Sequence, residues 1–234
     1  MFRRLACALA ILALTSAQAA FAQGARSVDN PTCPEHPNWS SYPEMRFTVQ
    51  QVNGRNVLLA EGQIDDAMLP RLQEALRTFQ GDEIWLRSPG GHARAGNEAG
   101  KIIRQAGIPT RVPAGWACFS ACNFMFMGGP IRFVDPGGLF VVHMFTHLGD
   151  KDAVRAEIAQ GADKTLGLIG DVEQDSALLA SEDNDFLIRM GVSRKLLTDV
   201  MYQQKAVAGS QGDQSTRRCL TQDELFKYNV VNAQ

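Results

Sequence analysis

From residue 46 onward the hydrophobic positions follow two different periods, and each period predicts its own kind of element. Apolar residues alternate with polar ones at Phe47, Val49 and Val52, Asn53-Gly54 follows, and a second apolar run covers 57–59. Two such runs separated by Asn-Gly predict a β-hairpin. Further strands are expected at 83–87, 110–112, 131–134 and 139–145.

A helical period fills the stretches between these strands. The first predicted helix has apolar residues at 69, 72, 76 and 79, and Asp65 or Asp66 can cap it. The second has them at 95, 99, 102, 103 and 106 and ends at Gly107. The third runs from Ser120 to Gly128. Residues 150–204 are helical in character, with breaks at Gly161, Gly167, Gly170 and Gly191, and a capping box at 221–224 starts a last helix before a candidate strand at 230–231. Strands alternating with helices predict βαβ units, so the expected fold class is α/β with a largely parallel sheet and a C-terminal helical region.

The first 22 residues have the pattern of a secretory signal peptide. Arg3 and Arg4 precede an apolar run over 5–14, and Ala20 and Ala22 mark a cleavage site, with a second candidate site at 17–19. An uncleaved anchor is the alternative, although the run is shorter than the about 20 apolar residues that a membrane span needs. We therefore expect a signal peptide at 1–22, an irregular arm at 23–45 and a folded domain at 46–234. The expected location is periplasmic or secreted, with no stable membrane insertion after cleavage.

The net charge of the mature chain argues against two classes of binding partner. Loss of Arg3 and Arg4 with the signal changes the formal charge from −2 to −4. A negative chain is a poor ligand for nucleic acid or anionic membranes, so neither is expected as a partner. The remaining part, about 210 residues, is long enough for one domain with its own core.

Export changes how the cysteines are interpreted, because disulfides persist in oxidising compartments. Cys33, Cys118, Cys122 and Cys219 remain after signal cleavage, and four cysteines allow three pairings. If Cys118 pairs locally with Cys122, the other two tie the ends of the chain together. Zinc binding is the competing interpretation, but no pair has the usual ligand spacing, so no metal and no cofactor are expected.

Three features in the middle of the chain carry candidate chemistry. Ser120 lies between a glycine-containing turn and an apolar helix, where a hydroxyl meets unpaired N–H groups; the alternative is a simple helix cap. His143 lies in an apolar strand that favours the neutral imidazole of a general base; a core histidine is the alternative, and His92 and His147 are further candidates. The Ser-Pro-Gly-Gly turn at 88–91 can point backbone N–H groups at a ligand, although turns commonly use these residues.

Together these features resemble the Clp protease proteolytic subunit. The resemblance lies in Leu-Arg-Ser-Pro-Gly-Gly at 86–91, in Ser120 at a helix start, in His143 placed 23 residues later, and in the tail 218–231. It implies a Clp/crotonase-like fold, a spiral of ββα units. It also implies Ser120 as nucleophile, His143 as base and the N–H groups of Gly91 and Ala121 as the oxyanion hole. An exported member is similar to the periplasmic Clp-like proteins, which lack an ATPase partner.

The chain departs from that family at the catalytic acid. Arg217 stands at the matching position, and Asp213, Asp199 and Asp185 are the candidates for a replacement. In the serine protease triad, loss of the acid's function costs about 10⁴ in rate. The cysteines on either side of Ser120 are a second departure. A bridge between them would stiffen the nucleophile turn, while a thiol redox module is an alternative function for the same pair.

The resulting hypothesis is an exported, ATP-independent serine hydrolase, a peptidase acting on peptide or protein substrates. The alternative is a catalytically weak or inactive Clp-like scaffold or interaction protein. The long helical region at 150–204 motivates that alternative, because the corresponding helix builds the oligomer in the family, and a homo-oligomer is therefore a further expectation. An acyl-CoA enzyme of the same broad fold ranks lower, since export removes its cofactor.

Overall fold

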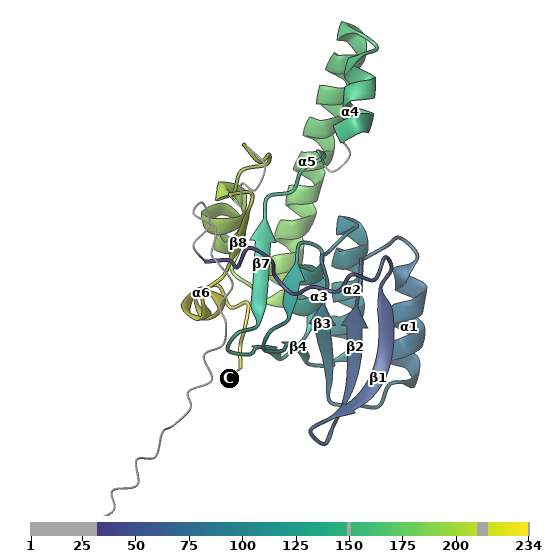
Figure 1. The fold of residues 1–234 in the computed structure, drawn as a ribbon, viewed down its shortest axis with the longest axis vertical. Helices are drawn as coiled ribbons and strands as arrows, with labels where there is room; N and C mark the ends of the chain where they lie inside the picture. The colour runs from purple at the N-terminus through teal and green to yellow at the C-terminus, as the bar shows by residue number, and fades with distance from the viewer. Residues whose placement is uncertain (1–31, 149–150, 210–214, 234) are drawn as a thin grey trace, which may run out of the picture.

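The computed structural model of the 234-residue chain describes residues 32–148, 151–209 and 215–233 (Figure 1). The predicted signal peptide and the first part of the arm lie outside the described residues. None of the described helices has both the length and the apolar character that crossing a membrane requires.

The strands of the described chain form two sheets. The larger sheet has the order β1-β2-β3-β4-β6, and the smaller one has the order β5-β7-β8. Neighbouring strands are parallel except in the pairs β1–β2 and β7–β8, so the fold is mixed α/β with mostly parallel strands. The strands are β1 (Arg46–Val52), β2 (Arg55–Glu61), β3 (Glu83–Arg87), β4 (Thr110–Val112), β5 (Ala117–Phe119), β6 (Arg132–Val134), β7 (Leu139–His143) and β8 (Arg217–Cys219).

The predicted hairpin at Asn53-Gly54 is confirmed and joins β1 to β2. The register pairs Val52 with Arg55, and the two turn residues have φ values of 51° and 78°. Positive φ at both central residues is the geometry that Asn-Gly favours, because its twist matches that of the flanking strands. The hairpin places β2 beside β3, and the glycine turn at 88–91 follows the end of β3.

Helices cover the sheets and fill the connections between strands (Figure 1). Gly107 ends α2 with a φ of 70°, as predicted for a glycine cap. Helix α1 begins later than predicted, because the Asp65 carboxylate accepts hydrogen bonds from the Met45 and Ala67 N–H groups ahead of the helix. The helical elements are α1 (Met68–Thr78), α2 (Ala93–Ala106), α3 (Cys122–Gly128), α4 (Lys151–Ile158), α5 (Ala162–Met190), η1 (Leu196–Val200), η2 (Met201–Gln203) and α6 (Gln222–Lys227).

Helix α5 runs through two glycines that were expected to break it. A Cβ at Gly167 or Gly170 would meet no atom within 4 Å beyond the neighbouring residues and backbone of its own helix, so both lie in open surroundings on the hairpin that α4 and α5 project from the body (Figure 1). A helical glycine costs about 1 kcal/mol relative to alanine, which does not end a 29-residue helix. The breaks occur instead at Gly161 and Gly191, where φ is positive.

The C-terminal prediction is partly correct. Thr221 and Glu224 form the expected capping box at the start of α6. The candidate strand at 230–231 is wrong: Val230 and Val231 are fully buried in the core, and the N–H group of each donates to the Leu225 carbonyl. These residues therefore close the end of α6 instead of pairing with a sheet.

Helix α3 lies at the centre of the core, and all of its residues are buried. A Cβ on Gly96 of α2 would lie 2.5 Å from the Ala121 carbonyl oxygen, so α2 packs directly on the backbone that leads into α3. A parallel bridge between Ser88 and Cys118 joins the two sheets. The residue after β3 therefore lies beside β5, and β5 leads directly into Ser120 and α3.

Candidate active site

Ser120 lies in the turn between β5 and α3. Its φ is 58°, in the left-handed region that residues other than glycine rarely adopt. Its N–H donates to the Val141 carbonyl at 3.3 Å, and its carbonyl accepts from the Asn123 N–H at 2.9 Å. The helix-cap alternative does not hold, since Ala121 is the N-cap of α3 and no side chain caps it. The hydroxyl faces β7 instead.

His143 is the last residue of β7, and its Nε2 lies 2.6 Å from Ser120 Oγ. The parallel pair of β5 and β7 sets Phe119 opposite Val141, so the carboxyl ends of both strands reach the same edge of the small sheet. A hydrogen bond between a hydroxyl and an imidazole is the contact that activates a serine nucleophile. The structure thus brings together the two residues that the sequence singled out.

Burial lowers the pKa of His143 below its ordinary value of 6.5, and a hydrogen bond with the Met144 backbone partly opposes this shift. The lowered pKa favours the neutral imidazole, which is the form that can accept the proton of the Ser120 hydroxyl.

The glycine turn at 88–91 passes directly beside Ser120. A Cβ on Gly90 would lie 2.6 Å from Ser120 Cβ, and a Cβ on Gly91 would lie 2.1 Å from the Ile64 carbonyl oxygen. Both glycines have positive φ, at 85° and 144°. No side chain fits at either position, so glycine allows the backbone to approach the serine closely.

Two backbone N–H groups next to this contact have no acceptor among the described residues, those of Gly91 and Ala121. The N–H that follows Gly91 is engaged, since His92 donates to the Ile64 carbonyl at 2.9 Å. Unpaired N–H groups beside a nucleophile can hold a negatively charged oxygen that develops during acyl transfer. The arrangement is chemically capable of forming an oxyanion hole.

The four cysteines within the described residues form two disulfides. Cys118 and Cys122, with Cα atoms 5.4 Å apart, bracket Ser120 between β5 and α3. Cys33 and Cys219, with Cα atoms 4.9 Å apart, tie the arm to β8. Their sulfur atoms are paired with one another, so none of the four is available as a thiolate ligand for zinc. Within the described ranges, no group of three His, Cys, Asp or Glu side chains is placed to hold a metal ion.

No carboxylate of the described residues pairs with His143. Asp185 and Asp199 are exposed, and each bonds to a residue of its own helical segment, so neither of these two candidates contacts the histidine. Asp213 lies outside the described residues. Arg217 lies directly opposite His143 in the antiparallel pair of β7 and β8.

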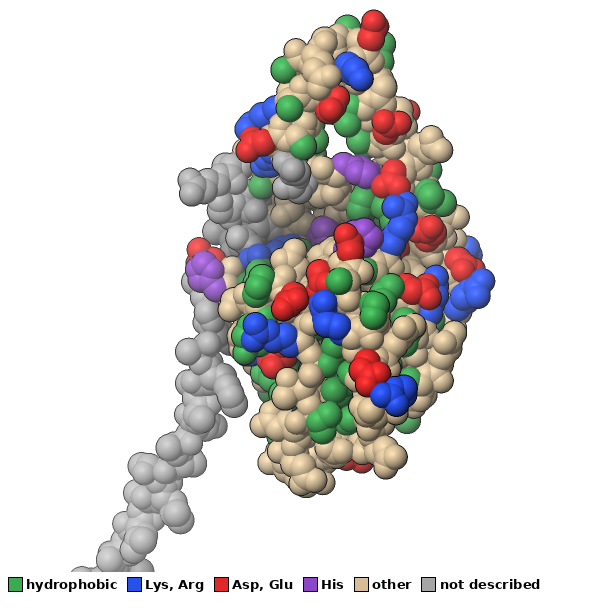
Figure 2. Space-filling model, turned by 90° about the vertical axis from the view of Figure 1, so that its right-hand side faces the viewer, with side chains coloured by type: hydrophobic (Ala, Val, Ile, Leu, Met, Phe, Trp, Pro, Cys, Tyr) green, Lys and Arg blue, Asp and Glu red, His purple; other side chains and the backbone are tan. Residues whose placement is uncertain are grey.

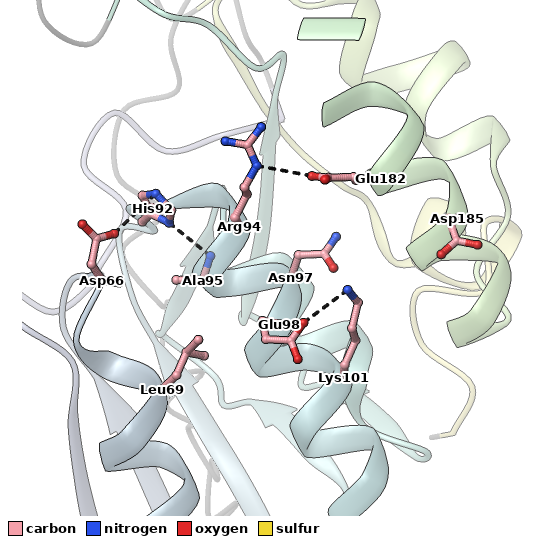
Figure 3. A pocket seen from close by; sticks show the side chains of 10 residues that line it. All are labelled: Asp66, Leu69, His92, Arg94, Ala95, Asn97, Glu98, Lys101, Glu182 and Asp185. Atoms are coloured by element: carbon pink, nitrogen blue, oxygen red, sulfur yellow. Dashed lines mark hydrogen bonds and ion pairs between the residues drawn. The ribbon is translucent and has the colours of Figure 1, made fainter. Parts of the chain in front are cut away.

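The other two candidate histidines have different partners. His92 caps α2: its Nδ1 accepts from the Ala95 N–H at 3.2 Å, and its Nε2 lies 3.4 Å from an Asp66 oxygen (Figure 3). His147 Nε2 lies 3.4 Å from an Asp175 oxygen. Neither of these histidines contacts the serine.

A pocket of about 560 Å³ opens between α2 and α5 and begins at His92, the residue after Gly91 (Figure 3). Its walls carry charges of both signs, and Arg94 Nε lies 3.5 Å from a Glu182 oxygen across it. Figure 2 shows charged and histidine side chains gathered between the projecting hairpin and the body. Neither member of the serine–histidine pair lines this pocket, so it lies beside the candidate site.

Two residues that support the pair were not predicted. Asn123 Nδ2 donates to the Val141 carbonyl at 2.8 Å and ties the first turn of α3 to β7. An asparagine inside the apolar run after Ser120 was a visible signal for this contact. Trp39 of the arm stacks on Phe119, with ring centroids 5.5 Å apart. Nothing in the local sequence pattern connects Trp39 to this site.

Comparison with known proteins gives matches by structure alone, because no protein-family model and no curated protein matches the chain. A substitution mutant of ClpP1 from Listeria monocytogenes has a TM-score of 0.50 at 17% identity, covering 76% of this chain and 89% of that one. ClpP1 from the same organism gives 0.47 at 16% identity with the same coverage. A membrane-bound stomatin-specific protease gives 0.43 at 13% identity, with 76% of each chain covered. The match to the ClpP1 mutant is a similarity of fold.

Proposed function

We propose that this chain is an exported serine hydrolase that cleaves peptide or protein substrates without ATP, with Ser120 as nucleophile and His143 as general base. The observation that carries the proposal is the 2.6 Å contact between Ser120 Oγ and His143 Nε2. Two disulfides support a periplasmic or secreted location, since disulfides persist in oxidising compartments.

The first half of the reaction forms an acyl-enzyme. Ser120 Oγ attacks the substrate carbonyl carbon while its proton passes to His143 Nε2, and the C=O electron pair moves onto the oxygen. The N–H groups of Gly91 and Ala121 hold that oxyanion. When the intermediate collapses, the C–N bond breaks and the leaving amine takes the proton from Nε2.

The second half returns the enzyme to its starting state. A water molecule attacks the acyl carbon, its proton passes to Nε2, and the resulting intermediate expels Ser120 Oγ, which recovers the proton. A neutral imidazole is required at the start of each half. Burial of His143 favours that state, because it lowers the pKa of the ring.

The similarity of fold to the ClpP1 mutant supports two further inferences, on the detailed fold and on the oligomer. We infer a Clp/crotonase-like spiral of ββα units and a homo-oligomer built through the projecting α4–α5 hairpin. Leu166 and Ile169 on that hairpin are exposed apolar side chains, which suits an association surface. We expect no ATPase partner.

The alternative of an inactive scaffold is favoured by one observation, the lack of a described carboxylate next to His143. It does not explain why the serine hydroxyl meets the imidazole in a turn with unpaired N–H groups on both sides. A hydrolase of low turnover accounts for both observations, because in the triad precedent loss of the acid's function lowers the rate by about 10⁴ without abolishing catalysis.

The test is hydrolysis of an unstructured protein, fluorescently labelled casein, by the purified exported chain in the absence of nucleotide. We expect slow turnover that Ser120→Ala and His143→Asn each abolish. Ser181→Ala is the matched control, because Ser181 is an exposed serine of α5 away from the site. Equal rates in wild type and Ser120→Ala would reject the proposal, and a folded wild type without turnover would favour the scaffold.

A further inference from the structure

The face of the small sheet that carries His143 is covered by the N-terminal arm. Side chains alternate between the two faces of a strand, so Val141 and His143 of β7 share a face with Phe119, Cys219 and Arg217 of the neighbouring strands. The arm, purple in Figure 1, crosses over this sheet. The arm and the His143 side chain therefore lie on the same face of the small sheet.

The arm reaches the histidine indirectly, through the ring of Phe119. The Trp39 and Phe119 rings are nearly parallel, at 19°, with centroids 5.5 Å apart. The Phe119 ring then meets the His143 ring at a centroid distance of 4.8 Å and a tilt of 46°. Phe119 thus lies between Trp39 and the imidazole, at distances where aromatic rings attract one another.

Arg217 holds the outer member of the stack. Its guanidinium carbon lies 5.6 Å from the centroid of the Trp39 ring, and its Nη2 donates to the Glu35 carbonyl at 2.7 Å. A guanidinium over an indole face is a favourable cation–π contact. The side chain at the family's acid position is thereby directed to the arm.

The arm is also fixed at two points that precede Trp39. Before it, the Cys33–Cys219 disulfide fastens the arm to β8. Next to it, the Asn38 carbonyl accepts from the Ala117 N–H, and Asn38 Nδ2 donates to the Gly115 carbonyl, both at 2.9 Å. Trp39 is therefore held in place while its own side chain remains partly exposed and outside the main core.

We propose that Trp39 is a positioning residue that, through Phe119, holds the His143 ring in the orientation that faces Ser120. No described carboxylate orients this ring, and its further hydrogen bond is to the Met144 backbone. The stacked rings occupy one side of the imidazole and limit its rotation. Arg217 supports the histidine through two aromatic rings instead of through opposite charge. This inference rests on the proposed function.

The experiment compares three variants of the purified protein, all checked for folding by circular dichroism. Trp39→Ala removes the stack, and Trp39→Phe keeps an aromatic ring at the same position. Trp85→Ala is the matched control, since Trp85 belongs to β3 and its ring packs against that of Trp116. The rate of labelling by a fluorophosphonate is measured over a range of probe concentrations. We expect Trp39→Ala to lower the maximal rate by about 10-fold with little change in the half-saturating concentration. Trp39→Phe should restore most of the rate, and Trp85→Ala should match wild type.

A second readout does not depend on catalysis. The chain has four histidines, and the NMR signal of the His143 Cε1–H is identified by its loss in His143→Asn. We expect Trp39→Ala to move this signal and Trp85→Ala to leave it in place. If the folded wild type is not labelled at all, the proposed hydrolase function fails, and the NMR signal alone tests the positioning role. An unmoved signal in Trp39→Ala overturns the inference in either case, and so does a labelling rate equal to that of Trp85→Ala where wild type reacts.

Discussion

Arg217 lies directly opposite His143 in the antiparallel pair of β7 and β8, and its guanidinium turns away to the arm. Side chains at opposed positions have Cβ atoms about 5 Å apart, so position 217 is within reach of the imidazole. The candidate site is therefore a serine–histidine pair with a cationic residue, and not a carboxylate, at the strand position opposite the histidine.

Placing a carboxylate at this position should change the titration of the histidine. We predict that Arg217→Asp raises the pKa of His143 by about 1 unit or more, because a nearby negative charge favours the imidazolium. The measurement is an NMR titration of the His143 Cε1–H signal. Arg217→Asn is the control, since it removes the cation without adding an anion. Equal titration midpoints in the two variants would show that a charge at position 217 has no electrostatic effect on the His143 ring.

The pH dependence of serine reactivity should follow the lowered pKa of His143. Only the neutral ring accepts the serine proton, so the labelling rate rises with pH and becomes constant above the pKa of the ring. Because burial lowers that pKa, half of the maximal rate should be reached below about pH 6.5. The check is the fluorophosphonate rate between about pH 4.5 and about pH 8. A midpoint at neutral pH or above contradicts the assignment of His143 as a buried base.

The Cys118–Cys122 disulfide should matter more for reactivity than for stability. It closes a loop of only five residues around Ser120, whose φ is in the left-handed region. The loss of loop entropy in the unfolded chain stabilises the fold by about 2 kcal/mol. We predict that Cys118→Ala with Cys122→Ala lowers the free energy of unfolding in urea by roughly that amount. The labelling rate should fall with it.

The second disulfide provides the comparison for stability. Cys33 and Cys219 are 186 residues apart, so their loss should cost roughly 5 kcal/mol on the same entropy argument. If removal of the local bridge leaves the labelling rate of Ser120 unchanged while the fold persists, the bridge does not hold the nucleophile turn.

Asp183 offers a test of how α5 packs on the body. Burial and the charge of Glu182 raise its pKa to about 7, while Asn97 of α2 acts in the opposite direction. The folded state then keeps a proton that the unfolded state loses near pH 4, so stability falls as pH rises from about 4 to about 7. We predict that Asp183→Asn removes this fall and gains roughly 1–3 kcal/mol at pH 7 relative to wild type. Asp185→Asn, at an exposed position, is the control for urea unfolding at both pH values.

The sequence predicted those parts of the site that depend on short segments. Ser120, His143 and the glycine turn belong to local motifs, and the parallel pairing of β5 with β7 brings the first two together. The hairpin and the glycine cap of α2 followed from local backbone preferences.

The predictions from the sequence are wrong or incomplete where contacts between residues far apart in the chain determine the local structure. Gly167 did not break α5, because the surrounding turns continue the helix and outweigh the small cost of each glycine. Asp65 was engaged by Met45 of the arm and so did not cap α1. The contact of Trp39 with Phe119 depends on a disulfide and on sheet register, neither of which the pattern around Trp39 reveals.

The most direct test of the central claim is to locate the fluorophosphonate adduct by mass spectrometry on the folded, exported protein. We expect an adduct on the peptide that contains Ser120, absent in Ser120→Ala and strongly reduced in His143→Asn, since the base that removes the serine proton is then missing. A folded wild-type protein that remains unmodified, or an adduct on Ser120 that does not depend on His143, would contradict the central claim.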